Sequence, residues 1–144
     1  MTENYENQYR IILEYIKDLS IETPSASTLL EVREKLANYN MEIDISSLVL
    51  KNNSLEITTK LILQDKSENE NKAFFEIKYA TVISINNSIT DKKLISKIVL
   101  CDLQKVIYPK IEKIFLEIIK NSGYPNVRFE KQVDFEQMYK DKFN

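Results

Sequence analysis

The sequence predicts an α+β fold in which four antiparallel strands precede two helices, in the order ββββαα. In the first half of the chain, apolar residues recur at every second position, which is typical of half-buried strands. In the second half they recur at every third or fourth position, which is typical of a helix with one apolar face. The strands have short polar connections, which favours an antiparallel sheet with the helices on one face.

The first strand is expected from Tyr15 to Thr23, because Pro24 supplies no backbone N–H to continue the sheet. Residues 1–14 before it are predicted to form a flexible polar arm. Within this strand, Asp18 and Glu22 share one face, since side chains alternate between the two faces.

Residues 24–40 form a crossover between the first and second strands. Thr28 followed by Glu31 resembles a weak capping box, which favours a short helix. A loop that wraps the edge of the sheet fits this segment about equally well.

Three further strands follow with clear alternation. The first runs from Met41 to about Ile45, and the pair Asn52-Asn53 then marks a turn. The segment SLEITTKLILQ is the third strand, DKSENENK a solvated hairpin loop, and AFFEIKYATVISI the fourth strand.

A long helix is predicted next, with Ser88 and Asp91 as its capping box. Pro109 removes one helical hydrogen bond and should kink or split this helix, and Gly123 should end it. The apolar stripe of the helix consists of Leu94, Ile95, Ile98, Val99, Leu103, Val106, Ile107, Ile111, Ile114, Phe115, Ile118 and Ile119. Such a stripe favours helix packing and an oligomer interface.

A short C-terminal helix is predicted from about Phe135, with Asp134 as its N-cap. We find no internal repeat and no composition shift, so residues 1–144 are expected to form a single domain.

The composition argues against several classes of function. The chain has no histidine and one glycine, so it lacks the residues for His-based catalysis, His-based metal sites and phosphate-binding loops. We therefore expect no metal and no cofactor. A net charge of −2 without a basic stripe argues against nucleic-acid binding.

Two further features of the sequence suggest a cytoplasmic protein. One cysteine cannot form an internal disulfide, and no signal peptide or apolar run of about 20 residues is present. We therefore expect no stable membrane insertion. Acid–base catalysis by the pairs Asp18/Glu22 or Glu42/Asp44 is disfavoured, because carboxylates on an exposed strand are solvated. The protein is thus not expected to be an enzyme.

Several motifs, taken in order, resemble those of the SecB protein-export chaperones. They are YIKDLSIETPSA and FFEIKYATVISI, an aromatic-Pro pair at Tyr108-Pro109, Gly123-Tyr124-Pro125, and the segment Val133 to Glu136 that opens the last helix. The resemblance extends from about Tyr15 to Tyr139.

This resemblance implies an ATP-independent chaperone that forms a homotetramer, built as a dimer of dimers. Such a protein binds unfolded precursor proteins in apolar grooves, keeps them competent for translocation and delivers them to the SecA ATPase. An alternative within the same fold is a SecB-like chaperone dedicated to a toxin–antitoxin system.

The family's SecA contact maps by resemblance onto Asp18, Glu22, Phe74 and Glu76. An exposed carboxylate cluster would attract a basic partner and raise the rate of encounter. The simpler alternative is that these acidic side chains only solubilise an exposed strand.

The family's client groove maps by resemblance onto six residues: Tyr39, Met41, Ile43, Phe135, Met138 and Tyr139. Methionine suits promiscuous binding because its side chain is flexible and polarisable. For Met41 and Ile43, an ordinary place in the core is an equal alternative. Cys101 is expected to be a buried thiol.

Overall fold

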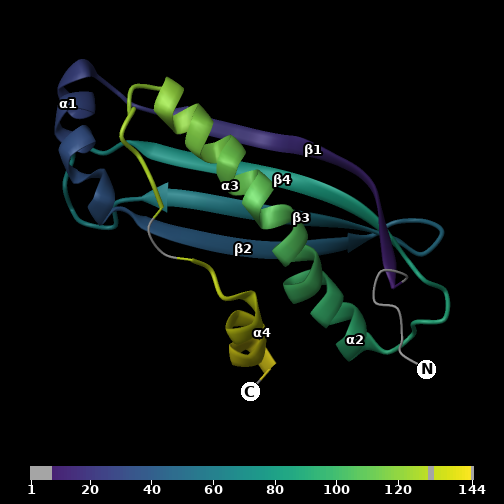
Figure 1. Ribbon diagram of the computed structural model, residues 1–144. Coiled ribbons are helices and arrows are strands. Elements are labelled where there is room, and N and C mark those ends of the chain that lie inside the picture. Colours follow the sequence, from purple (N-terminus) through teal and green to yellow (C-terminus); the bar gives the residue numbers. More distant parts are fainter. Residues whose placement is uncertain (1–7, 130–131, 144) are drawn as a thin grey trace.

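The computed structural model describes residues 8–129 and 132–143, and Figure 1 shows their arrangement. The strands are β1 (Tyr9–Glu22), β2 (Asn40–Val49), β3 (Ser54–Gln64) and β4 (Phe74–Ile85). They form one antiparallel sheet in the spatial order β1-β4-β3-β2. The predicted four-stranded antiparallel sheet followed by helices is confirmed.

β1 begins six residues earlier than predicted, at Tyr9 rather than Tyr15. Residues 9–14 therefore belong to the sheet and not to a flexible arm, while residues 1–7 lie outside the described part. Two bulges, between Ile11 and Leu13 and between Ile16 and Asp18, insert extra residues into this strand. The bulges break the two-residue period, so the alternation that would have revealed the start of the strand is lost.

The crossover contains α1 (Ala26–Lys35) and a 3-10 turn (Leu36–Asn38), so the helical alternative is the correct one. Its N-cap is Ser25 rather than Thr28: the Ser25 hydroxyl accepts the Thr28 N–H at 3.1 Å. Because β1 and β2 are the two edge strands, the crossover spans one end of the sheet, where α1 lies in Figure 1.

The β2–β3 hairpin turns at Asn52 and Asn53, which have φ angles of 61° and 59°. Two consecutive positive φ angles are typical of a type I′ turn, in which asparagine is favoured. The predicted turn is confirmed.

The long helical layer consists of α2 (Lys92–Lys97), a π-helical turn (Ile98–Asp102) and α3 (Leu103–Asn121). Asp91 caps α2 by accepting the Lys93 N–H at 3.0 Å. In Figure 1 this layer lies across one face of the sheet. No helix in the described part of the chain is long and apolar enough to span a membrane.

The helix is not split at Pro109, which lies inside α3. Ile107 and Ile111, on either side of Pro109, are both fully buried, so packing against the sheet holds the helix together at the missing hydrogen bond. The irregularity lies earlier, where the Leu103 N–H donates to the Ile98 carbonyl in the π-helical turn.

A buried glutamine ties this turn to the sheet. The side chain of Gln104 donates to the Val99 carbonyl at 3.3 Å and accepts from the Thr59 hydroxyl at 3.1 Å. Gln104 and Thr59 are both fully buried. Each therefore satisfies the other's polar atoms away from water, as buried polar groups require.

The core lies between this helical layer and one face of the sheet. Odd-numbered residues of β3 and β4 point into it, while even-numbered residues point to the opposite face. We call that opposite face, which the helices leave uncovered, the outer face. Fully buried core residues include Ile57, Leu61, Phe75, Ile77, Ile83, Ile107, Ile111, Phe115 and Ile119.

The chain ends with α4 (Phe135–Phe143), whose start is as predicted. Asp134 accepts the Gln137 N–H at 3.0 Å and thus acts as the predicted N-cap.

Gly123 follows α3 with a φ of +110°, a conformation that side chains rarely adopt. A Cβ at this position would lie 2.8 Å from Cδ1 of Leu29 on α1. We expect Gly123→Ala to lower the free energy of unfolding by about 1–3 kcal/mol, as measured by denaturant titration. The exposed helical control Lys120→Ala should change it by about 0.5 kcal/mol or less. Equal effects of the two substitutions would contradict this account.

Candidate functional site

The described residues include no group of three His, Cys, Asp or Glu side chains that could hold a metal ion. Cys101 is fully buried, as expected, and burial raises the pKa of its thiol. A raised pKa keeps the sulfur protonated and unreactive. Two other features remain as candidate sites: the outer face of the sheet and a cavity at its α1 end.

On the outer face, the structure brings the four predicted SecA-contact residues together. Ser20 lies directly opposite Glu76, and Glu22 lies opposite Phe74, on the neighbouring strands β1 and β4. Asp18 is two residues along β1 from Ser20, so it flanks Glu76 on the other side. Asp18 and Glu22 are exposed, whereas Phe74 and Glu76 are partly exposed. We call these four residues the acidic patch.

A cation, Lys78, lies directly beside the acidic patch. Lys78 lies directly opposite Asp18, and its Nζ is 4.0 Å from Oε1 of Glu76. Lys60 on β3 lies opposite Lys78, and Asp44 on β2 lies opposite Lys60. One row across the sheet therefore reads Asp-Lys-Lys-Asp. Alternation along β4 places Lys78 on the same face as Glu76, but only the strand register reveals that Asp18 and Asp44 lie in the same row as the two lysines.

Elsewhere on the outer face, side chains of β1 and β3 interact across β4, the strand that lies between them. The Tyr15 hydroxyl on β1 donates to Glu56 on β3, and Lys17 forms an ion pair with the same carboxylate at 3.5 Å. Tyr15 lies opposite Ala80, which has no exposed surface although it points to the outer face. The hydrogen bond from Tyr15 lowers the pKa of Glu56. Glu56 is therefore already paired within the chain.

The second feature is a cavity of about 680 Å³ at the α1 end of the sheet. We call it the edge cavity. Its walls come from the crossover, the start of β2, the end of β3, the middle of α3 and the segment after Gly123. The apolar and aromatic lining residues are Leu36, Ala37, Tyr39, Met41, Ile43, Leu63, Tyr108, Tyr124, Pro125, Val127, Phe129 and Val133, with Arg33, Glu34 and Arg128 also present.

The edge cavity contains three of the six predicted groove residues: Tyr39, Met41 and Ile43. Met41 and Ile43 are half-buried, so they contribute to the core and to the cavity wall at once. The sequence analysis did not predict the lining residues Tyr108, Tyr124, Val127, Phe129 and Val133. Three of them lie in the segment GYPNVRF, whose aromatic and aliphatic side chains were a signal for this wall.

The other three predicted groove residues lie on α4 and do not line this cavity. Phe135 is buried, and its ring packs edge-to-face against Tyr108 with centroids 5.2 Å apart. Met138 is 38% exposed, and the Tyr139 hydroxyl donates to the Lys93 carbonyl at 3.3 Å. Phe135 thus supports the cavity wall through Tyr108. The client-binding role of all six residues stays a prediction.

An aromatic chain holds the α1 end of the cavity in place. Tyr39 packs edge-to-face on Phe75, with centroids 6.2 Å apart, and Phe75 packs on Tyr124 at 5.1 Å. The Tyr124 hydroxyl lies 2.7 Å from that of Thr23 at the end of β1. Four separate segments therefore fix this wall.

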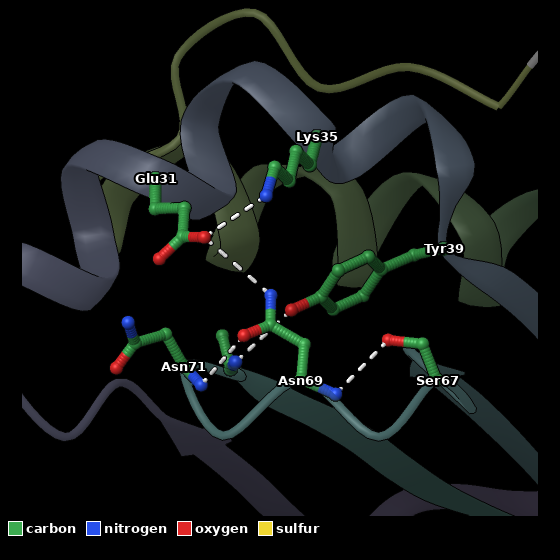
Figure 2. Close-up of polar contacts among 7 residues, drawn as sticks. Glu31, Lys35, Tyr39, Ser67, Asn69 and Asn71 are labelled. Carbon is green, nitrogen blue, oxygen red and sulfur yellow. Dashed lines mark hydrogen bonds and ion pairs between the residues drawn. The ribbon is translucent and has the colours of Figure 1, made fainter.

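Figure 2 shows how the β3–β4 loop is attached to α1 beside Tyr39. Glu31 accepts from Lys35 at 2.9 Å and from the Asn69 side chain at 3.5 Å. Asn69 in turn accepts the Asn71 N–H at 3.1 Å. The hydrogen bond from Lys35 is the largest contribution to a lowered pKa of Glu31, so this carboxylate is charged at neutral pH.

The fold and the two surfaces define a small α+β protein whose sheet has one covered face, one open face and a cavity at one end. The model of the family described as "Preprotein translocase subunit SecB" matches residues 2–144. The chain belongs to the SecB family of protein-export chaperones.

Relatives agree with this assignment. A putative protein-export protein SecB from Pelagibacter ubique is 44% identical over 144 residues, covering all of both chains. Protein-export protein SecB from Rhodopseudomonas palustris is 26% identical over 135 residues, which cover 92% of this chain and 79% of that one. Family membership points to a binding protein rather than to an enzyme.

A solved structure shows the same fold at low identity. It is the SecB-like chaperone of Mycobacterium tuberculosis in complex with a ChAD peptide from an antitoxin. The match has a TM-score of 0.64 and 9% identity, and it covers 88% of this chain and 93% of that one.

The Tyr39 hydroxyl accepts the backbone N–H of Ala73 at 3.0 Å, and Ala73 is only 2% exposed. We expect Tyr39→Phe to leave this buried N–H unpaired and to lower the free energy of unfolding by about 1–3 kcal/mol. Denaturant titration measures the change. Tyr15→Phe removes the exposed hydroxyl on the outer face and should have a clearly smaller effect. A Tyr39→Phe variant as stable as the wild type would contradict this role of the hydroxyl.

Proposed function

We propose that this protein is an ATP-independent chaperone that binds unfolded preproteins at the edge cavity, keeps them competent for translocation and delivers them to SecA. The observation that carries the proposal is the edge cavity itself. Its volume falls within the range of about 300–1,000 Å³ that is typical of ligand sites. An unfolded chain offers apolar side chains that fit such a lining.

The cavity lining supports binding that is strong enough to hold a chain but not selective for one sequence. Burial of one large apolar side chain contributes about 1.5–3 kcal/mol. Met41 adds a flexible side chain that adapts to different partners. Arg33 places a charged group among the lining residues, so polar parts of a bound chain also find a partner there.

Delivery to SecA is assigned to the acidic patch. Asp18 and Glu22 are exposed and Glu76 is partly exposed, so the three carboxylates outnumber the adjoining Lys78, and Phe74 supplies an apolar contact beside them. Such a surface accelerates encounter with a basic partner and discriminates against acidic ones.

We further propose a homotetramer, built as a dimer of dimers, in the cytoplasm. Five large apolar side chains of β1 are between 40% and 48% exposed: Ile12, Leu13, Tyr15, Ile16 and Leu19. So many exposed apolar side chains on one edge strand favour burial against further copies. The alternative of a dedicated antitoxin chaperone is not favoured, because the relative that is 44% identical over the full chain is named for protein export.

The client site is tested by the suppression of aggregation of reduced α-lactalbumin, measured by light scattering. We expect the wild-type protein to suppress aggregation and Ile43→Ser to lose most of this effect, because a hydroxymethyl group replaces an apolar wall of the cavity. Ile45→Ser is the matched control, since Ile45 lies on the same face of β2 but does not line the cavity.

The possible outcomes separate the two parts of the proposal. If the wild-type protein does not suppress aggregation, the chaperone function is wrong. If both variants lose the effect equally, the function stands but the edge cavity is not the client site.

The partner site is tested by calorimetric titration with SecA. Replacing Asp18 by Asn and both Glu22 and Glu76 by Gln should weaken binding by about tenfold or more at low salt, since three attractive charges are lost. Circular dichroism would show that the triple variant remains folded.

Two further variants make this test sharper. Lys78→Gln should strengthen SecA binding, because Lys78 offsets the charge of Glu76 and Asp18. The triple substitution Glu68→Gln, Glu70→Gln and Glu117→Gln removes the same charge elsewhere and should have little effect. Unchanged binding by the acidic-patch variant would rule out the site.

A further inference from the structure

The β2–β3 hairpin ends in three consecutive apolar side chains that are largely exposed. Leu48, Val49 and Leu50 are 59%, 76% and 38% exposed, and Val49 is the most exposed large apolar residue in the described part of the chain. Lys51, which follows them, is exposed as well. We call residues 48–51 the hairpin tip. Single exposed apolar side chains are common, but a contiguous group of them is typical of a contact surface.

The hairpin tip is apolar on both sides of the sheet and is held in place. Leu48 points to the outer face and Val49 to the helix side, since neighbouring residues of a strand face in opposite directions. The Leu50 N–H donates to the Ser54 carbonyl at 2.8 Å, and the Ile85 N–H donates to the Asn53 carbonyl at 3.1 Å. The tip is thus fixed to the ends of β3 and β4 and projects beyond them.

The same end of the sheet carries several cations. Arg10 on β1 lies in one row with Ser84 and Ser54, beside the hairpin tip. The Asn53 side chain donates to that of Asn87, and five residues further along the chain α2 begins with two lysines. The exposed cations here are Arg10, Lys51, Lys92 and Lys93, and none of them forms an ion pair with another described residue.

Charge is therefore divided between the two ends of the sheet. The acidic patch and the edge cavity lie at the α1 end, where β2 begins, and the hairpin tip lies where β2 ends, ten residues or about 30 Å away (Figure 1). Glu56 lies opposite Leu48, but its carboxylate is already paired with Tyr15 and Lys17. An anionic surface would attract the end with the hairpin tip and repel the acidic patch.

We propose that the hairpin tip adsorbs to an anionic membrane surface. Its apolar side chains enter the boundary between lipid headgroups and acyl chains, while the surrounding lysines and Arg10 contact the headgroups. A tip that is apolar on both sides fits this partner, because a lipid interface surrounds it, whereas a flat protein surface would cover one side and leave the other in water. The contact is adsorption at the surface and needs no membrane-spanning segment.

This inference goes beyond the proposed chaperone function and does not depend on it. An adsorbed chain would keep the acidic patch and the edge cavity in water, since they lie at the far end of the sheet.

The first test uses tryptophan fluorescence, because the chain has no tryptophan of its own. With vesicles of phosphatidylglycerol and phosphatidylcholine in equal parts, the emission of Val49→Trp should shift to shorter wavelength as the indole leaves water. Leu30→Trp is the matched control, since Leu30 on α1 is 65% exposed, and its emission should not shift. Added salt and pure phosphatidylcholine vesicles should each reduce the shift of Val49→Trp, because both weaken the attraction of the cations to the surface.

The second test measures binding to the same vesicles by sedimentation. Val49→Asp should weaken binding about tenfold or more, since an apolar group is replaced by a charge that anionic lipid repels. Leu30→Asp makes the same change of charge on α1 and should have little effect. Circular dichroism would show that both variants remain folded.

Three results would overturn the proposal. The first is a wild-type protein that does not bind the anionic vesicles. The second is an equal response of the Val49 and Leu30 variants in either test, which would indicate adsorption without a defined site. The third is a Val49→Asp variant whose mass, measured by light scattering without lipid, is lower than that of the wild type, because the hairpin tip would then be an interface between copies of the chain.

Discussion

The burial of one face of the sheet under a single helical layer is the constraint on which the rest of the structure depends. α3 places Ile107, Ile111, Phe115 and Ile119 against the inward side chains of β3 and β4, and all four are fully buried. One layer of helix covers one face, so the other face must tolerate water. The charged row on that face follows from this arrangement.

The strands and the last helix could be predicted from sequence because their local signals agree with the tertiary structure. Alternation in β3 and β4 is unbroken, and Asn52-Asn53, Asp134 and Gly123 occupy the turn, cap and helix-end positions for which they are suited. The start of β1 could not be predicted, since its bulges shift the phase of the pattern. The π-helical turn could not be predicted either, and Gln104, which follows it closely, is paired with Thr59, a residue far away in the sequence.

The candidate sites could be predicted only in part, because the sequence does not reveal which residues lie opposite one another on neighbouring strands. Alternation along each strand is enough to place Asp18 and Glu22 on one face, and Phe74 and Glu76 on one face. It does not reveal that Lys78 and Lys60 lie side by side in the same row. Of the cavity lining, the sequence analysis predicted only Tyr39, Met41 and Ile43. The other walls come from segments far apart in the chain that only packing brings together.

The acidic patch and the wall of the edge cavity lie on opposite faces of the sheet, where β1 ends and β4 begins. Phe74 faces outward beside Glu22, while the adjacent Phe75 packs inward on Tyr39 and Tyr124. Thr23, next to Glu22, holds the Tyr124 hydroxyl. The outward-facing Phe74 and the inward-facing Phe75 are joined by a single peptide unit, so the acidic patch and the cavity wall share one stretch of backbone at this end of β4.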